Sequence, residues 1–253
     1  MAFLEKSGNP TLNEKTFQKA QPIYHDGSVM TVKGTINKFG IMFLLLLATA
    51  SFTWKAAADG KNILPWIIGS AIIGLIVVIV LSFKPIWAAF LAPVYALIEG
   101  VFVGGISAYY NDAFATVAPS IVMQAVGLTF GVVIAMYALF HFKVISATRK
   151  FRSVVMAATF GIFIFYMLSF VLSFFSVQMP LIHENSMWGI GFSLIVVVVA
   201  ALNLILDFDM IEKGAAMGAP KYMEWYGSFA LMVTIVWLYI EMLRLLSKLA
   251  SRD

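Results

Sequence analysis

Four acidic side chains stand inside long apolar stretches of this sequence or directly after one: Glu99, Asp207, Asp209 and Glu241. If those stretches cross a membrane, each carboxylate near the centre costs roughly 2.5–3.5 kcal/mol to insert. Two carboxyl groups held close together in a low-dielectric site cannot both ionise easily, so they share a proton and respond to pH. Their oxygens are also ligands for a hard cation such as Ca²⁺. The four acids are therefore candidates for an ion path or for pH sensing.

Asp207 is the strongest of these candidates. It follows Asn203 by four residues, which places both side chains on one face of a helix. Asp209 points about 200° away from Asp207 around the helix. An acid at a helix end near the membrane interface can also face water or pair with Lys213 without any functional role. We favour this interfacial interpretation for Asp209. Asp207 is expected to lie deeper, and it is where Ca²⁺ would bind if the protein holds a metal ion.

Glu99 has two interpretations that the sequence leaves open. Gly100 and Gly104 follow it, and the spacing of four residues between these two glycines lets a neighbouring helix backbone approach closely. Glu99 then either joins packed helices or lines an ion path, whereas the glycines and Asn203 serve helix packing. Lys84, in a predicted tight turn, is a candidate charge partner for Asp207, although an interfacial anchor is the simpler interpretation.

Several chemistries are excluded by what the chain lacks. It has no Cys, so disulfides, thiolate catalysis and thiolate metal sites are impossible. Its three histidines are far apart in sequence and form no compact metal motif. No nucleophile–base arrangement is visible. We therefore expect neither an enzyme nor a resident cofactor, with Ca²⁺ entering only as a permeant or bound ion.

The elements that carry these residues are apolar and long. Hydrophobic residues make up 61% of the 253 residues and charged residues 12%, against about 25% in soluble domains. A helix crosses the hydrocarbon core in about 20 residues, and seven stretches qualify: 39–54, 62–83, 85–110, 113–140, 153–182, 185–206 and 225–246. The sequence predicts an all-α integral membrane protein with seven transmembrane helices. A six-span or re-entrant version stays open, because three of the five basic residues expected on the outer side, Arg244, Lys248 and Arg252, are assigned to the C-terminal tail.

Charge distribution predicts the orientation and the domains. We expect a polar cytoplasmic tail over residues 1–35 and one membrane domain over residues 36–250. With the N-terminus inside, twelve Lys and Arg residues lie on the cytoplasmic side and five on the other, as the positive-inside rule requires. These basic residues alternate with apolar stretches and are not gathered on one surface, so nucleic-acid binding is not expected.

Six segments of the chain resemble the transmembrane Bax inhibitor motif family, in its longer bacterial branch. They are residues 7–17, 30–38, 99–107, 206–214, 218–226 and 236–246. The resemblance implies a seven-helix fold with a central last helix, in a bacterial inner membrane. In the better understood branch of the family it implies a pH-sensitive calcium leak gated by acids on the last two helices.

The resemblance maps residue by residue with one departure. Glu99 and Gly100 match the family's Glu-Gly, and Asp207, or Asp209 after a two-residue shift, matches the acid at the end of helix six. Where the family has an Asp early in helix seven, this chain has Thr234 or Trp237, and the acid within residues 225–246 is Glu241. Glu241 is thus the expected substitute partner for Asp207.

Three functions follow as expectations. The first is a cation leak for Ca²⁺ in which protonation of Asp207 and a partner acid shifts a closed-to-open equilibrium. The second is a non-conducting modulator whose polar residues 2–38 bind a membrane protease or a stress-response partner. The third is a proton-coupled transporter.

Overall fold

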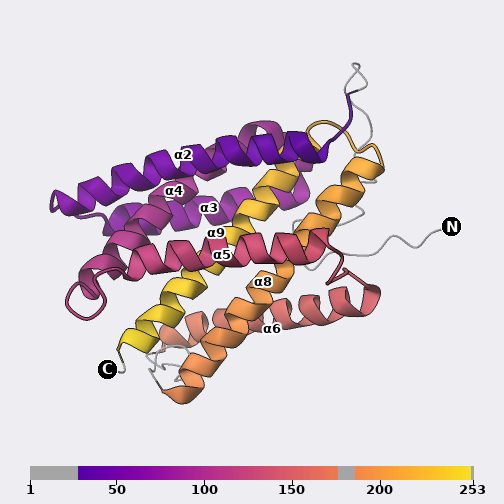
Figure 1. The fold of residues 1–253 in the computed structure, drawn as a ribbon. Coiled ribbons are helices and arrows are strands. Elements are labelled where there is room, and N and C mark those ends of the chain that lie inside the picture. Colours follow the sequence, from indigo (N-terminus) through magenta and orange to yellow (C-terminus); the bar gives the residue numbers. More distant parts are fainter. Residues whose placement is uncertain (1–27, 176–185, 252–253) are drawn as a thin grey trace. The chain divides into compact units, whose positions relative to one another are not determined.

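The computed structural model describes residues 28–175 and 186–251, and seven helices in these ranges are long and apolar enough to cross a membrane (Figure 1). The all-α prediction is confirmed. The helices are α2 (Val32–Ala58), α3 (Leu64–Phe83), α4 (Ala88–Ala113, after a 3-10 turn at Pro85–Trp87), α5 (Ile121–His141), α6 (Arg149–Ser173), α8 (Met187–Ala216) and α9 (Met223–Ala250).

Helix α2 begins earlier than hydropathy predicts. Its N-cap is Thr31, whose side chain accepts a hydrogen bond from the backbone N–H of Gly34, and such a cap stabilises the first turn. Helix α2 thus begins within the predicted tail of residues 1–35 and extends beyond both ends of the predicted span of residues 39–54. The basic residues at this end, Lys33 and Lys38, belong to the helix.

Two boundaries in the middle of the chain also differ from the prediction. Helix α4 continues to Ala113, and α5 begins at Ile121 instead of residue 113. Pro119 lies between them and disfavours helical geometry in the residue before it. Helix α6 begins at Arg149 because Thr148 caps it. Its predicted end at residue 182 lies outside the described residues.

Helix α8 continues ten residues beyond the predicted end at Leu206. Asp209 and Lys213 form an i,i+4 ion pair with a 3.0 Å separation, which supports this polar part of the helix. The helix stops just before Gly218, whose φ of +68° is the left-handed conformation typical of a helix C-terminus. Asp207 and Asp209 thus lie within α8 and not at its end.

Helix α9 settles the question of the seventh span. Its 28 residues give a length of about 42 Å at 1.5 Å per residue, enough to cross a roughly 30 Å hydrocarbon core. The six-span and re-entrant alternatives are therefore wrong. In α8 and α9, 61% of the most apolar stretch is buried, against 17–28% in the other five helices. The last two helices are the most enclosed, as a fold with a central last helix requires.

The described residues form two compact units. One contains residues 28–109 and Leu206–Val233, and the other contains residues 110–205 and 234–251. Helices α8 and α9 each contribute one part to each unit. The core of the second unit includes Ile162 of α6 and Val196 and Val199 of α8.

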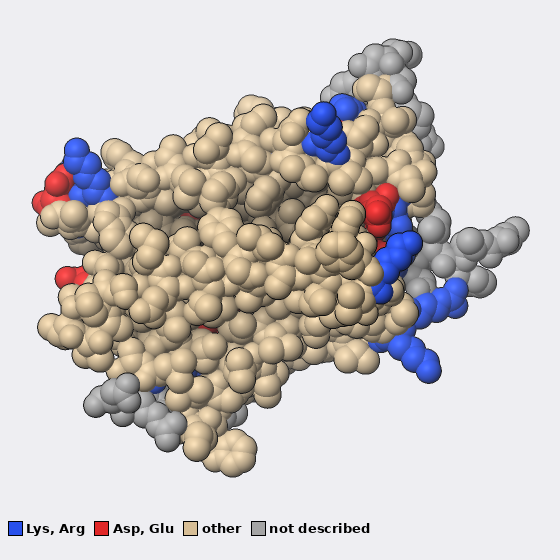
Figure 2. Space-filling model, in the orientation of Figure 1, with Lys and Arg blue, Asp and Glu red and all other residues tan. Residues whose placement is uncertain are grey.

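The outer surface is apolar. Large side chains such as Phe83 (81% exposed) and Trp188 (80% exposed) face outward, and Figure 2 shows few Lys, Arg, Asp or Glu side chains on the face in view. A surface of this kind is unfavourable in water but matches the hydrocarbon of a bilayer. The protein is embedded in lipid through its seven apolar helices.

Candidate functional site

Asp207 is fully buried in an apolar part of α8. Its exposed fraction is 0%, and the preceding Leu204, Ile205 and Leu206 are at most 1% exposed. The side chain of Asp209 is 14% exposed and pairs with Lys213. The two acids therefore differ: Asp209 is partly exposed and has an i,i+4 ion pair, whereas Asp207 is fully enclosed.

Asn203, one turn before Asp207 along α8, joins this helix to α6. Its Nδ2 donates hydrogen bonds to Thr159 Oγ1 and Val199 O, both at 2.8 Å. Its Oδ1 is buried without a hydrogen-bond partner among the described residues. A buried acceptor without a donor is costly, so Asn203 is a polar position between apolar residues of α8.

Glu99 lies on α4 facing α3. A side-chain hydrogen bond joins it to Tyr95, one turn earlier on the same helix. A Cβ atom at Gly74 of α3 would lie 3.2 Å from Glu99 Oε2, so this glycine leaves room for the carboxylate. Glu99 therefore has a hydrogen-bond partner and a neighbouring helix beside it, which fits the brace interpretation that the sequence left open.

Gly100 and Gly104 place α4 directly against α2. A Cβ atom at Gly100 would lie 2.3 Å from the carbonyl oxygen of Leu46, and one at Gly104 would lie 2.3 Å from that of Ala50. Real Cβ atoms essentially never approach this closely. The two helices can therefore pack at this distance only with glycine at both positions.

Glu241 lies in a partly buried polar cluster of the second unit, together with Tyr166 of α6 and Arg244. Arg244 Nη1 lies 2.8 Å from Glu241 Oε1 and 2.5 Å from the Tyr166 hydroxyl, which is itself 3.1 Å from both carboxylate oxygens. The guanidinium group also lies 4.9 Å from the centre of the Tyr166 ring. Glu241 is 2% exposed, and its charge is balanced on its own helix.

The pairing of Glu241 with Arg244 and Tyr166 was not predicted, although the sequence contains a signal for its first part. Arg244 follows Glu241 by three residues, a spacing that brings side chains together on a helix. From sequence, Arg244 is counted among the charges of the C-terminal tail, whereas the structure places it in α9 beside Glu241. Lys248, one turn further along α9, is also buried and donates to the carbonyl of Gly189 at 3.0 Å.

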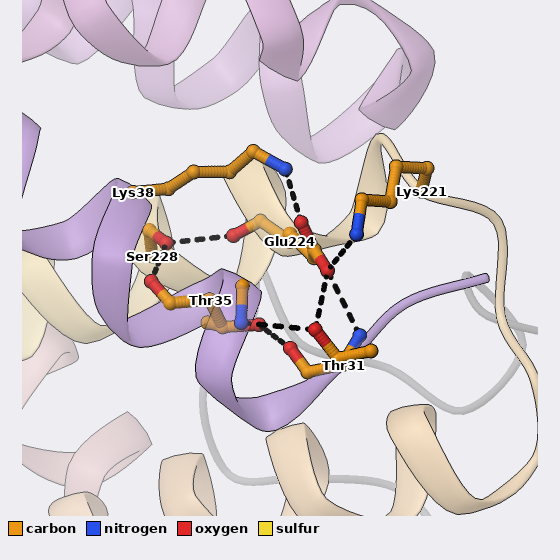
Figure 3. Close-up of polar contacts among 7 residues, drawn as sticks. Thr31, Thr35, Lys38, Lys221, Glu224 and Ser228 are labelled. Carbon is orange, nitrogen blue, oxygen red and sulfur yellow. Dashed lines mark hydrogen bonds and ion pairs between the residues drawn. The ribbon is translucent and has the colours of Figure 1, made fainter. Parts of the chain in front are cut away.

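A second missed residue is Glu224, in the first turn of α9. Figure 3 shows its carboxylate between Thr31 and Lys38 of the α2 end and Lys221 before α9. The Glu224 side chain is 1% exposed and forms ion pairs with both lysines. We call Glu224, Thr31, Lys38 and Lys221 the Glu224 clamp. It escaped notice because Glu224 lies one residue before the predicted span of residues 225–246.

Some predicted partnerships remain predictions. Asp207 and Glu241 belong to different units, so their pairing is not tested. Lys84 is exposed, with its Nζ 5.6 Å from the ring centre of Trp87, and its pairing with Asp207 also stays a prediction. Residues 28–175 and 186–251 contain no group of three or more His, Cys, Asp or Glu side chains able to hold a metal ion. Ca²⁺ at Asp207 would need carbonyl and hydroxyl oxygens as further ligands.

Comparison with known families agrees with these features. The profile of the family described as Bax inhibitor 1 like matches residues 9–251, nearly the whole chain. Comparison with curated proteins finds no match. The match covers the helices that carry Glu99, Asp207 and Glu241 as well as the Glu224 clamp. The chain is a multi-span membrane protein that belongs to the Bax inhibitor 1-like family.

Proposed function

We propose that this protein is a cation leak pathway for Ca²⁺, opened and closed by protonation of a buried carboxyl group, and that Asp207 is this group. The observation that carries the proposal is the complete burial of Asp207 within a membrane-spanning helix. An intramembrane acid is costly to insert and is usually kept for ion or proton handling. The proposal places the protein in a bacterial inner membrane with its N-terminus in the cytoplasm.

The surroundings of the acids rank them for this role. Glu241 is balanced by Arg244 and hydrogen-bonded to Tyr166, so a change in its protonation would break an existing ion pair. Glu99 is held beside Tyr95 and Gly74 and acts as a brace. Because Asp207 is 0% exposed within α8, we expect its protonation to control the pathway. Glu241 is then the proposed partner acid on α9, and its protonation would act by breaking its contacts with Arg244 and Tyr166.

The test is Ca²⁺ flux into proteoliposomes across roughly neutral pH, where a coupled carboxyl pair could titrate. Asp207→Asn removes the ionisable group while keeping its size, and we expect its flux to lose its dependence on pH. Glu212→Gln is the matched control, because it removes an exposed carboxylate from the same helix. A pH profile of Asp207→Asn identical to the wild type would refute the assignment.

A non-conducting modulator is the second candidate, and one observation favours it. Residues 28–31 are tied to the end of α9 through the Glu224 clamp, so a protein bound to residues 1–27 would act next to α9. The discriminating deletion should end at residue 27, because Met30 is 1% exposed and part of the fold. A deletion that abolishes partner binding but leaves flux intact would favour this candidate. Neither function is enzymatic.

A further inference from the structure

The first turn of α2 is capped by a side chain from α9. Both the backbone N–H and the hydroxyl of Thr31 donate to Glu224 Oε1, at 2.9 and 2.8 Å. In a capping box, an acid at the third helical position performs this role from within the same helix. Here that position is Gly34. Glu224, 193 residues from Thr31 in sequence, supplies the missing carboxylate.

Gly34 is required by this arrangement. A Cβ atom at residue 34 would lie 2.0 Å from Glu224 Oε1 and 2.3 Å from its Cδ. Any other residue would displace the carboxylate from the helix end. The third position of α2 thus lacks an acid of its own and leaves the space that the acid of α9 occupies.

A single carboxylate collects all the charge interactions of this contact. Lys221 Nζ lies 2.8 Å from Oε1, and Lys38 pairs with Oε2. Lys38 Nζ also lies 5.5 Å from the centre of the Trp225 ring. The carboxylate lies at the N-terminal ends of α2 and α9, where helix dipoles favour negative charge. Loss of this one charge would weaken every one of these interactions together.

Backbone and hydroxyl contacts also attach the segment before α2 and the first turn of α2 to the same place. Met30 N–H donates to Ala219 O at 2.7 Å, and Val29 forms an isolated β-bridge with Pro220. The Ser228 hydroxyl shares its proton between the carbonyls of Thr35 (2.7 Å) and Glu224 (2.6 Å). Met30 is buried, but Val29 is 49% exposed and Val32 is 38% exposed. So little apolar burial makes local opening easy once the polar contacts are lost.

We propose that residues 28–35 form a strap that Glu224 latches onto the N-terminal end of α9, and that its release is a regulatory movement of this fold. The strap follows directly after residues 1–27 in sequence. Binding of a partner to residues 1–27 would therefore affect the α8–α9 connection by releasing or holding the strap. The strap itself does not depend on the proposed cation pathway. Its effect on flux does rest on that function.

Hydrogen exchange measured by mass spectrometry tests the latch. Glu224→Gln keeps the shape of the side chain but removes its charge, and we expect the amides of residues 30–34 to exchange at least about tenfold faster. Glu224→Asp keeps the charge but is one methylene shorter, so an intermediate increase is expected. Glu212→Gln is the charge-matched control and should leave these amides unchanged. Wild-type exchange rates in Glu224→Gln would overturn the latch.

A disulfide lock tests whether release has a regulatory effect. The chain has no Cys, so Val29→Cys with Pro220→Cys introduces one thiol pair at the β-bridge. We expect lower Ca²⁺ flux in the oxidised than in the reduced protein, and higher flux in Glu224→Gln than in the wild type. Equal flux in all forms would make the strap a static brace and overturn the regulatory role. A complete absence of flux in the wild type would instead refute the cation pathway, and partner binding to residues 1–27 in oxidised and reduced protein would then decide regulation.

Discussion

Replacement of Gly104 by Ala should separate α2 from α4 and destabilise the first unit. The added methyl carbon would lie 2.3 Å from Ala50 O, 2.7 Å from Ala50 Cα and 2.9 Å from Ala50 C. Ordinary van der Waals contact begins at 3.4 Å, so the backbones must move apart by about 1 Å. The neighbouring atoms belong to backbone, which cannot rotate away as a flexible side chain can.

The expected cost follows from two opposing effects. Overpacking of a tight contact costs about 1–3 kcal/mol, and Ala is a better helix former than Gly by up to about 1 kcal/mol in water. We therefore expect a net destabilisation of about 1–2 kcal/mol. Close packing at Gly100 limits relaxation, because its own Cβ position is 2.3 Å from Leu46 O.

Reversible unfolding in mixed micelles, followed by circular dichroism as the denaturing detergent is increased, measures this difference. Gly131→Ala is the matched control, because no heavy atom outside the nearby backbone of its own helix lies within 4 Å of the added Cβ. The control should have unchanged or slightly higher stability. If Gly104→Ala and Gly131→Ala unfold at the same detergent fraction, the close α2–α4 contact is not present in the folded protein.

Three further predictions concern these polar contacts. Glu241→Gln should lower the unfolding free energy by about 2–3 kcal/mol in the same assay. This is less than the roughly 3–5 kcal/mol for a fully buried ion pair, because Arg244 is 27% exposed. The double change Glu241→Met with Arg244→Met should cost less than the sum of the two single changes. Tyr166→Phe should cost about 1–2 kcal/mol, because the carboxylate and the guanidinium each lose one hydrogen bond, and a cost below about 0.5 kcal/mol would contradict this cluster. Gly34→Ala should speed amide exchange at residues 30–34 as Glu224→Gln does, whereas Gly40→Ala, with open space around its Cβ, should not.

Helix ends show where sequence reasoning reached its limit. Hydropathy measures the local preference for lipid, so it stops at the first charged residue. Helix α8 continues past Asp207 because Asp209 pairs with Lys213, and α2 begins before Lys38 because Thr31 caps it. In both helices, specific polar contacts decide the boundary where average polarity predicts an end.

The candidate site divides in the same way. The burial of Asp207 and the close packing at Gly104 agree with expectations from residue type and spacing. Arg244 had the correct spacing from Glu241, but spacing alone does not distinguish a buried partner from a charge in a terminal tail. Tyr166 joins them from α6, 75 residues away in sequence, and no local pattern indicates that contact.

An all-α membrane protein with seven spans could be predicted from the amino-acid order alone, because stretches of about 20 apolar residues are stable as helices in a bilayer. The same order also identified the acids that are costly there. The partners of the buried acids follow from tertiary packing: Arg244 and Tyr166 for Glu241, and Thr31, Lys38 and Lys221 for Glu224, an acid that the sequence did not single out. Burial in lipid is a property of each segment, whereas a hydrogen bond across 193 residues exists only once the helices have packed.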